Sequence, residues 1–365
     1  MRPVQQARPE IWRVDPEHPD SEAIARAAEV IRRGGLVAFP TETVYGLGAD
    51  ALNPEAVARI FEAKGRPAHD PIIVHVAETK DLNSVAQEVP SVAWRLVEAF
   101  WPGPLTLVLR RADKVPLVVT AGGETVAVRC PAHPVALALI RAAGTPIAAP
   151  SANRFGHTSP TTAQHVLDDL DGRFDLLLDG GPTPVGVEST VLDLTGEVPT
   201  ILRPGGLPRE ALEAVLGKVA VQERQPKGEE PLPSPGLLDR HYAPHAELWL
   251  FTGPPDDVLA AMRREARLAR EAGKRVGLLV ADEDVERVAD GGVLVKSVGP
   301  AGDLKAVARR LFAALRALDA QQPDIILARD FPPAGLGLAV HDRLVRAADR
   351  IVRVASKERK DLTTN

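Results

Sequence analysis

The stretch Leu-Val-Ala-Phe-Pro-Thr-Glu-Thr-Val-Tyr-Gly-Leu-Gly, residues 36–48, decides the fold of the first half of the chain. Its leading apolar residues predict a buried strand that ends at Pro40, and hydroxyl groups and glycines follow at once. An amphipathic helix is expected before it, over residues 23–33, because Gly34 and Gly35 provide the usual stop. Hydroxyls and glycines just past the end of a strand are typical of a ligand-binding edge in an α/β sheet.

Strand-length apolar segments continue along the chain to about residue 202. Helices are expected over residues 53–64, 92–100 and 134–143, but several strands follow one another with no helix between them. The first unit is therefore predicted to hold a mixed, twisted open sheet of the α+β kind rather than a purely parallel one. The expected strands cover residues 72–76, 105–109, 126–130, 146–149, 176–178, 189–194 and 200–202.

A polar, proline-rich stretch interrupts this pattern over residues 222–245, and we interpret it as a linker. Beyond it, strands alternate with long helices, which predicts a second, smaller, Rossmann-like parallel α/β domain. We therefore expect a first domain over residues 1–221, the linker, and a C-terminal domain over residues 246–365. The expected elements of the last part are strands at 248–251, 275–280 and 324–327 and helices at 256–272, 304–318 and 338–348.

The composition is that of an ordinary globular protein, with 45% hydrophobic and 25% charged residues in 365. The single cysteine, Cys130, excludes an intrachain disulfide. A single cysteine is typical of a reducing compartment, and no apolar export segment stands near the start. We therefore expect a cytoplasmic protein, and because no long apolar run occurs, one without a membrane span. The net charge of −5 argues against a broad basic surface that wraps nucleic acid.

Four cations stand next to strand ends or glycine turns: Lys64, Arg66, Arg129 and Arg203. Arg129 and Arg203 end apolar strands, and an unpaired buried charge is very costly, so each must leave the core or meet an anion. Together with neighbouring hydroxyls, the four cations favour a polyanionic ligand held by charge and backbone amides.

Each signal alone has a plainer interpretation. Lys64 and Arg66 follow a helix and could simply offset its dipole, unless Gly65 turns them together into a phosphate clamp. His75 alone is typical of a packed core histidine, and Ser159 of a helix cap.

The glycine pair imitates a dinucleotide fingerprint in Gly46-x-Gly48-x-x-Ala51, but five residues separate it from the strand. Taken alone, the segment favours a glycine turn without chemistry, so a nicotinamide oxidoreductase receives little weight. No P-loop, no zinc-spaced Cys/His cluster and no G-x-S-x-G elbow occurs in the sequence.

Several of these segments resemble the signature of the YrdC-like family: Pro-Thr-Glu-Thr-Val-Tyr-Gly-Leu from residue 40, Lys64-Gly-Arg66 and Ser151-Ala-Asn153. The later segments 186–190 and 201–205 match too, so the resemblance covers residues 23–216. The linker, with Ser-Pro-Gly from residue 234, and the segments 335–339 and 342–344 are similar to the long, two-domain threonylcarbamoyladenylate synthases. One departure is Leu-Leu-Asp at residues 237–239, where an aromatic and a basic residue are common.

The resemblance implies a YrdC fold around a concave cavity and the reaction of L-threonine, bicarbonate (or CO2) and ATP to L-threonylcarbamoyladenylate and pyrophosphate. It implies ATP as substrate with Mg²⁺ beside it, while the sequence names no metal ligand. The product would feed N6-threonylcarbamoyladenosine synthesis in tRNA through a separate threonylcarbamoyl transferase of the TsaD or Kae type.

Carried over residue by residue, the resemblance assigns Lys64 and Arg66 as the catalytic cations. It assigns L-threonine binding to Thr43, His75, Arg129 and Ser189. It surrounds ATP with Lys64, Arg66, Asp70, Thr125, Ala149, Ser151, Asn153, Ser159, Arg203 and Tyr242. Because Tyr242 belongs to the linker, the linker is a candidate lid.

Two rivals keep the fold and change the function. One is a non-catalytic double-stranded RNA-binding module that uses the same basic hollow, against which the net charge counts. The other is a carbamoyl-adenylate-forming enzyme of the hydrogenase-maturation type, which usually carries acylphosphatase and zinc-finger segments that this sequence lacks.

Overall fold

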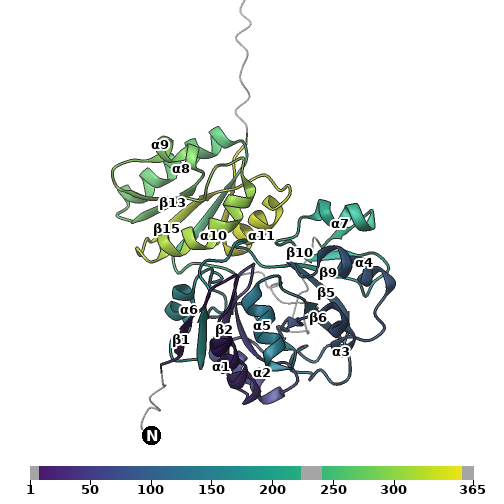
Figure 1. Ribbon diagram of the computed structural model, residues 1–365. Helices are drawn as coiled ribbons and strands as arrows, with labels where there is room; N and C mark the ends of the chain where they lie inside the picture. The colour runs from purple at the N-terminus through teal and green to yellow at the C-terminus, as the bar shows by residue number, and fades with distance from the viewer. Residues whose placement is uncertain (1–7, 223–240, 356–365) are drawn as a thin grey trace, which may run out of the picture.

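The computed structural model describes residues 8–222 and 241–355, which fold around two β-sheets (Figure 1). The smaller, C-terminal unit lies on top of the larger one. It faces the larger unit with α10 (Leu304–Asp319) and α11 (Gly337–Ala347), while α8 (Pro255–Glu271) covers the other side of its sheet. No helix among the described residues is long and apolar enough to cross a membrane.

The larger sheet has 11 strands and is mixed, as the sequence predicts. Its strands are β1 (Glu10–Arg13), β2 (Val37–Pro40), β3 (Tyr45–Asp50), β4 (Val74–His75), β5 (Leu105–Arg110), β6 (Thr125–Arg129), β7 (Ile147–Ala148), β8 (Leu176–Asp179), β9 (Thr190–Asp193), β10 (Thr200–Arg203) and β11 (Ala220–Val221). They lie in the order β1-β8-β2-β3-β7-β4-β6-β5-β9-β10-β11. The sheet contains parallel pairs such as β4 with β6 and antiparallel pairs such as β5 with β6, which confirms the mixed, twisted fold class.

Strand β3 is where the sequence interpretation was wrong. The expected glycine turn is instead a strand that forms an antiparallel hairpin with β2, with Phe39 opposite Gly46. A side chain at Gly48 would place its Cβ 2.7 Å from both Phe39 and Ile147. These contacts explain the glycine by close packing inside the sheet rather than by approach to a phosphate.

The helices of this unit begin where the sequence offers capping groups. Asn53 accepts from the backbone N–H groups of Glu55 and Ala56 at the start of α2, and Asp20 does the same for α1. The helices are α1 (Ser21–Arg32), α2 (Pro54–Lys64), η1 (Thr79–Asp81), α3 (Leu82–Val85), α4 (Ser91–Phe100), α5 (Pro134–Ala143), α6 (Ala163–Leu170) and α7 (Arg209–Leu216).

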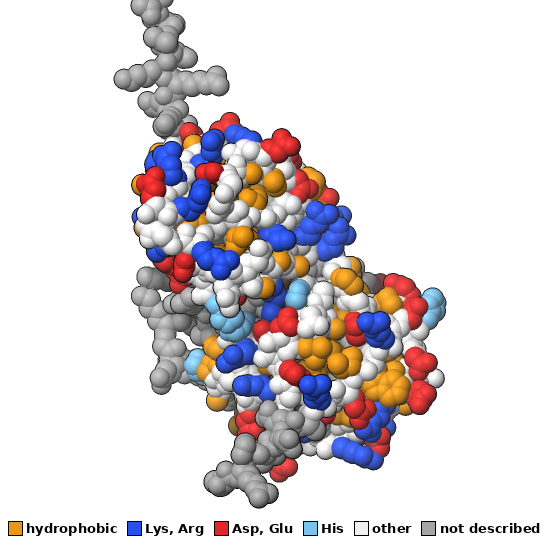
Figure 2. Space-filling view, turned by 90° about the vertical axis from the view of Figure 1, so that its left-hand side faces the viewer, with side chains coloured by type: hydrophobic (Ala, Val, Ile, Leu, Met, Phe, Trp, Pro, Cys, Tyr) orange, Lys and Arg blue, Asp and Glu red, His pale blue; other side chains and the backbone are white. Residues whose placement is uncertain are grey.

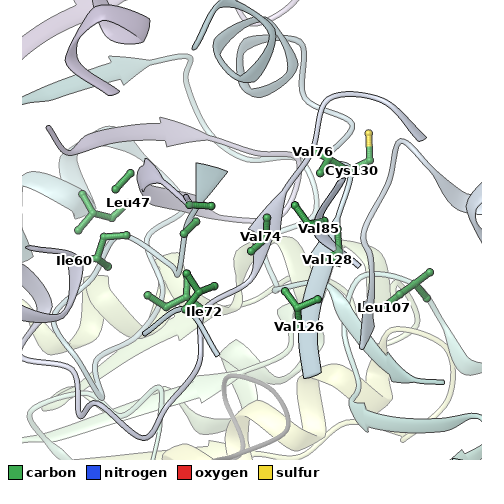
Figure 3. Close-up of a cluster of buried hydrophobic side chains, with 14 of the residues drawn as sticks. Leu47, Ile60, Ile72, Val74, Val76, Val85, Leu107, Val126, Val128 and Cys130 are labelled. Atoms are coloured by element: carbon green, nitrogen blue, oxygen red, sulfur yellow. The ribbon is translucent and has the colours of Figure 1, made fainter. Parts of the chain in front are cut away.

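Aliphatic side chains fill the core of the larger unit, as the scarcity of aromatic residues requires (Figure 3). Leu47, Ile60, Val74, Val128 and Leu107 are each 0% exposed and come from separate strands and helices. Burial of one such side chain stabilises the fold by roughly 1.5–3 kcal/mol. The core therefore fixes the strand ends from which the polar side chains project.

The smaller sheet has five strands that are all parallel, as expected for a Rossmann-like unit. The sequence interpretation missed its two edge strands, β14 and β16, which are partly exposed and mix apolar with charged residues. The order is β14-β13-β15-β12-β16. Its elements, besides the three helices above, are β12 (Glu247–Thr252), β13 (Val276–Val280), η2 (Asp282–Asp284), α9 (Val285–Val288), β14 (Val293–Ser297), β15 (Ile325–Arg329) and β16 (Arg350–Arg353).

The two units share a hydrophobic cluster and an ion pair. Val44 and Val187 of the larger unit pack in one cluster with residues of α10 and α11. Arg316 on α10 pairs with Asp169 on α6, at 3.0 Å between Nη2 and Oδ2. Most of the expected linker, residues 223–240, lies outside the described residues.

Candidate active site

One cavity opens where several strand ends and loops of the larger unit meet residues 241–242. The β2–β3 hairpin, the ends of β4, β6 and β10, and the loops after β7 and before β9 form its wall. It is lined by Thr41, Thr43, Val44, Tyr45, Gly46, Arg66, Ile73, His75, Arg129, Ala149, Pro150, Ser151, Glu188, Ser189, Arg203, His241 and Tyr242.

Arg129 lies at one end of this cavity and is fixed from three sides. Its guanidinium donates to Thr43 Oγ1 at 2.9 Å and to the Gly103 carbonyl at 3.3 Å, and it pairs with Glu42 Oε1 at 2.7 Å. The side chain is 4% exposed. A guanidinium held in this way is a preorganised site for a carboxylate.

His75 lies beside Arg129 because β4 and β6 pair in parallel register. Burial, with Arg129 as a further cause, lowers the pKa of His75 to about 3. His75 is therefore a buried, neutral imidazole in the cavity wall, and its buried Nδ1 has no hydrogen-bond partner among the described residues.

Hydroxyl groups and Arg203 form the neighbouring wall. Ser189 Oγ lies 2.7 Å from Thr106 Oγ1, and Arg203 donates to the Ser189 carbonyl at 3.0 Å. The Arg203 bond ties β10 to the loop before β9, and the Thr106 contact ties the same loop to β5. They place a second guanidinium next to a serine hydroxyl, which suits an anionic ligand with polar groups.

Arg66 reaches the cavity after Gly65 ends α2 with a positive φ of 65°. It pairs with Asp70 at 2.9 Å and donates to the carbonyls of Asp70 and Pro71. Asp70 is 0% exposed and does not line the cavity, so in this structure it holds Arg66 rather than facing a ligand.

Lys64 does not line the cavity. The structure therefore differs from the expected phosphate clamp, in which Lys64 and Arg66 both face the ligand. Its Nζ donates to the carbonyls of Ser151 and Asn153 and fastens the loop after β7. Burial, with Arg66 as a lesser cause, lowers the pKa of Lys64 well below its ordinary value. The expected four-cation wall therefore contains three arginines, with the lysine behind one of its loops.

Of the other predicted nucleotide contacts, some line the cavity and others lie outside its lining. Ala149 and Ser151 line the cavity, whereas Asn153 is buried behind it and donates to backbone carbonyls. Thr125 begins β6, pairs with Arg110 on β5, and so lies at the opposite end of β6 from Arg129. Thr125 is off the cavity in this structure.

Ser159 is not the helix cap that its sequence position suggests. Thr162 caps α6, and Ser159 Oγ instead donates to the carboxylate of Glu188. Glu188 lies in the cavity wall and is 5% exposed. Ser159 thus supports the wall through Glu188.

Tyr242 and His241 close one side of the cavity. Their rings lie 4.0 Å apart between centroids, and Tyr242 adopts an uncommon φ of 63°. Burial, followed by Glu188, raises the pKa of Tyr242, and its hydroxyl has no partner among the described residues. A buried phenol without a partner is costly, so a hydrogen bond from a bound molecule to this hydroxyl would offset that cost.

Sequence reasoning gave no role to four polar residues that line the cavity, Thr41, Tyr45, Glu188 and His241, or to Glu42, which pairs with Arg129 from outside the lining. All of them stand inside segments that the sequence analysis names. Two of them, Glu42 and Glu188, could have been found from the sequence, because each is an acidic residue among apolar residues and hydroxyls. A buried carboxylate there requires a cation as its partner. Arg129 and Arg343 supply those cations.

No group of three or more His, Cys, Asp or Glu side chains within residues 8–222 and 241–355 could hold a metal ion. The cavity carboxylate, Glu188, is already bound by Ser159 and Arg343. A metal at this site would therefore have to arrive with an oxygen-rich ligand of its own.

The fold and the site define a mixed α/β protein with one cavity that is lined by three buried arginines. A family model with the description "Telomere recombination", for the Sua5, YciO and YrdC proteins, matches residues 29–205. A second, "Threonylcarbamoyl-AMP synthase, C-terminal domain", matches residues 207–349.

Full-length relatives point to the same family as the two family models. Threonylcarbamoyl-AMP synthase of Pyrococcus abyssi is 48% identical over 90% of this chain and 95% of the relative, and that of Bacillus subtilis is 47% identical over 90% and 94%. A crystal structure of P. abyssi Sua5 with L-threonine superposes with a TM-score of 0.89 at 46% identity, over 94% of this chain and 99% of that one. The chain belongs to the two-domain threonylcarbamoyl-AMP synthase family.

Proposed function

We propose that this protein converts L-threonine, bicarbonate (or CO2) and ATP to L-threonylcarbamoyl-AMP and pyrophosphate. The names of its full-length relatives and the L-threonine complex of the P. abyssi protein support this reaction. The product is the activated group that a separate threonylcarbamoyl transferase, of the TsaD or Kae type, would pass to tRNA. We also divide the chain into a catalytic domain at 1–221, a linker at 222–245 and a C-terminal domain at 246–365.

One observation carries the proposal: Arg66, Arg129 and Arg203 are all buried and all line a single cavity. ATP, bicarbonate and a carboxylate repel one another in solution. Fixed guanidinium groups offset that repulsion before the reaction starts, and they need no reorganisation during it.

Threonine occupies the end of the cavity near Arg129 in this proposal. The guanidinium faces the substrate carboxylate, while Thr43 and Ser189 present hydroxyls to its polar groups. Neutral His75 offers one ring nitrogen without adding a charge. The neutral threonine amine adds to the carbon of CO2, which forms the N–C bond of the carbamate, and the nitrogen releases one proton to solvent. The distances around Arg129 support this assignment, because each partner holds the guanidinium in place.

ATP occupies the other end, between Arg66 and Arg203, with Ser151 and Tyr242 at its edges. Lys64, Asp70, Asn153 and Ser159 act from behind by holding the loops and side chains that touch it. Ala149 offers backbone groups, and Thr125 would reach ATP only if the substrate extends along β6. Mg²⁺ enters as MgATP, held by the phosphates, because the described cavity carries no carboxylate cluster for it.

The chemistry is an in-line substitution at phosphorus. A carbamate oxygen of N-carboxythreonine attacks the α-phosphorus, the bond from that phosphorus to the bridging oxygen breaks, and pyrophosphate leaves with the electron pair. A carbamate is already an anion, so the step needs no general base. Positioning and charge neutralisation by the arginines supply the catalysis.

Tyr242 suits a lid over the nucleotide side. Its ring is buried, its hydroxyl is unpaired among the described residues, and it belongs to the proposed linker. Most of the linker, residues 223–240, lies outside the described part of the chain.

The experiment is an assay of pyrophosphate release from MgATP in bicarbonate buffer, with and without L-threonine. Threonine-dependent release supports the proposal, and the adenylate is identified by mass spectrometry. A double-stranded RNA-binding module would release none. Basic and acidic side chains are intermixed on the face in Figure 2, which does not suit a broad RNA-binding surface. Binding of RNA without pyrophosphate release would overturn the proposal.

A further inference from the structure

Arg343 is the largest fully buried side chain in the described part of the molecule, yet it comes from the C-terminal unit. It lies on α11, the helix that faces the larger unit (Figure 1). Its Nε donates to Glu188 Oε2 at 2.7 Å, and its guanidinium carbon lies 4.9 Å from the centroid of the Tyr242 ring. One side chain of the second unit thus touches two walls of the cavity in the first.

Glu188 depends on this contact because it is a buried carboxylate next to the proposed phosphate site. Burial alone would raise the pKa of Glu188, but Arg343, Arg203 and the hydrogen bond from Ser159 together lower it. Removal of one partner of a buried ion pair leaves an uncompensated charge, which is strongly unfavourable. Without Arg343, the wall facing ATP would carry a buried negative charge that is less fully compensated.

The position of Arg343 is set by the interface rather than by a mobile surface. Asp342 on the same helix binds both Arg343 and Arg346, and α11 packs in the cluster that also contains Val187. Gly186 allows the loop before β9 to lie directly on α10, since a Cβ there would stand 2.4 Å from the Arg309 Cα. The loop that carries Glu188 is therefore held against the second unit by both packing and charge.

We propose that Arg343 is a positioning residue of the active site, and that the C-terminal unit completes this site by holding Glu188 and Tyr242. The inference rests on the proposed function. It assigns Arg343 no contact with substrate, because Arg343 does not line the cavity. Arg343 acts on the site indirectly: it compensates the charge of Glu188, which in turn accepts from Ser159, and it packs against the Tyr242 ring.

The test compares Arg343→Met with Arg329→Met in the full chain. Arg329 is the matched control: it is 6% exposed, belongs to the same unit, and pairs with buried Asp284 away from the cavity. Arg343→Met should raise the KM for MgATP by about tenfold or more, the scale of losing an outer partner of a ligand-contacting group. The KM for threonine should change much less. Arg329→Met should lower thermal stability and leave both KM values near those of the wild type.

A second change separates positioning from simple destabilisation. Glu188→Gln in the Arg343→Met background removes the orphaned charge, while the amide oxygen still accepts from Ser159. The double variant should recover at least half of the lost ATP affinity, so the two changes are far from additive. Arg343→Lys, which keeps the charge, should fall between Arg343→Met and the wild type.

Two outcomes would overturn the inference. One is an Arg343→Met enzyme that melts earlier, as Arg329→Met does, but keeps the wild-type KM for MgATP. The other is a double variant with no recovery. Wild-type enzyme that releases no pyrophosphate would instead reject the proposed function, so the two failures are distinguishable.

Discussion

Arg129 and Thr43 are joined by a hydrogen bond of 2.9 Å between Nη1 and Oγ1, although 86 residues separate them in the chain. The bond ties the end of β6 to the loop between β2 and β3. Thr43 is 0% exposed and also lies 2.8 Å from Thr41 through the two hydroxyl oxygens. The threonine end of the proposed site is therefore assembled before any substrate arrives, which is the condition for electrostatic preorganisation.

Arg129→Met should remove the proposed carboxylate contact. We expect kcat/KM for threonine to fall by about 10²–10³, the loss typical of one preorganised donor, with a smaller effect on the KM for MgATP. Steady-state pyrophosphate release with each substrate varied in turn measures both. Arg110→Met, an exposed arginine at the end of the neighbouring strand, is the control. An equal loss for both substrates would contradict the assignment of Arg129 to threonine.

Arg66→Ala and Lys64→Ala should both slow the reaction, but in different ways. Arg66 lines the cavity, so its loss should lower kcat/KM for MgATP by about 10²–10³.

Lys64 fastens the loop of Ser151 through backbone carbonyls, so its removal should lower activity and thermal stability together. Lys80→Ala, at an exposed lysine, is the control. Unchanged pyrophosphate release in both variants would reject the role of this segment.

The sequence predicts the regular elements well because local signals determine them. Asn53 and Pro54 at the start of α2, with Gly65 at its end, fix one helix from capping alone. The parallel C-terminal sheet follows from the alternation of strands and helices. Strand β3 could not be predicted in the same way, because its glycines are explained only by the packing of Phe39 across the hairpin.

In the candidate site too, some residues could be predicted from the sequence and others could not. Motif resemblance pointed to Arg66, Arg129 and Arg203, and the structure brings them to one cavity. The partners that fix them were not predictable, because a pair such as Glu188 and Arg343 is 155 residues apart. Such pairs depend on how the two units dock, which no local pattern records.

Tyr242→Ala should weaken ATP binding more than Tyr242→Phe does. The phenylalanine variant loses only the unpaired hydroxyl, whereas the alanine variant also loses the ring that packs against His241 and Arg343. We expect the Kd for MgATP to rise by about tenfold in the alanine variant, since an aromatic contact contributes on the order of 1 kcal/mol beyond the area it buries. Calorimetric titration measures the affinities. Wild-type affinity in Tyr242→Ala would exclude Tyr242 from the nucleotide side.

The buried imidazole of His75 should make the fold sensitive to acid. Its pKa is lowered from an ordinary value of 6.5 to about 3, first by burial and then by Arg129. Between these values the unfolded chain binds a proton that the folded chain does not, so stability is fully present above pH 6.5 and is lost as the pH falls toward 3. The slope contributed by one such group is at most about 1.4 kcal/mol per pH unit.

His75→Gln removes this proton, so the variant should lose less stability than the wild type between pH 6.5 and 4, even if it is less stable at pH 7.5. Chemical denaturation at a series of pH values gives the free energy of unfolding for each protein. His18→Gln, at an exposed histidine, is the matched control for the histidine-to-glutamine change. If His75→Gln shows the full wild-type slope, the imidazole already carries its proton in the folded protein. In that case a neutral His75 beside Arg129 would no longer be available to the threonine site.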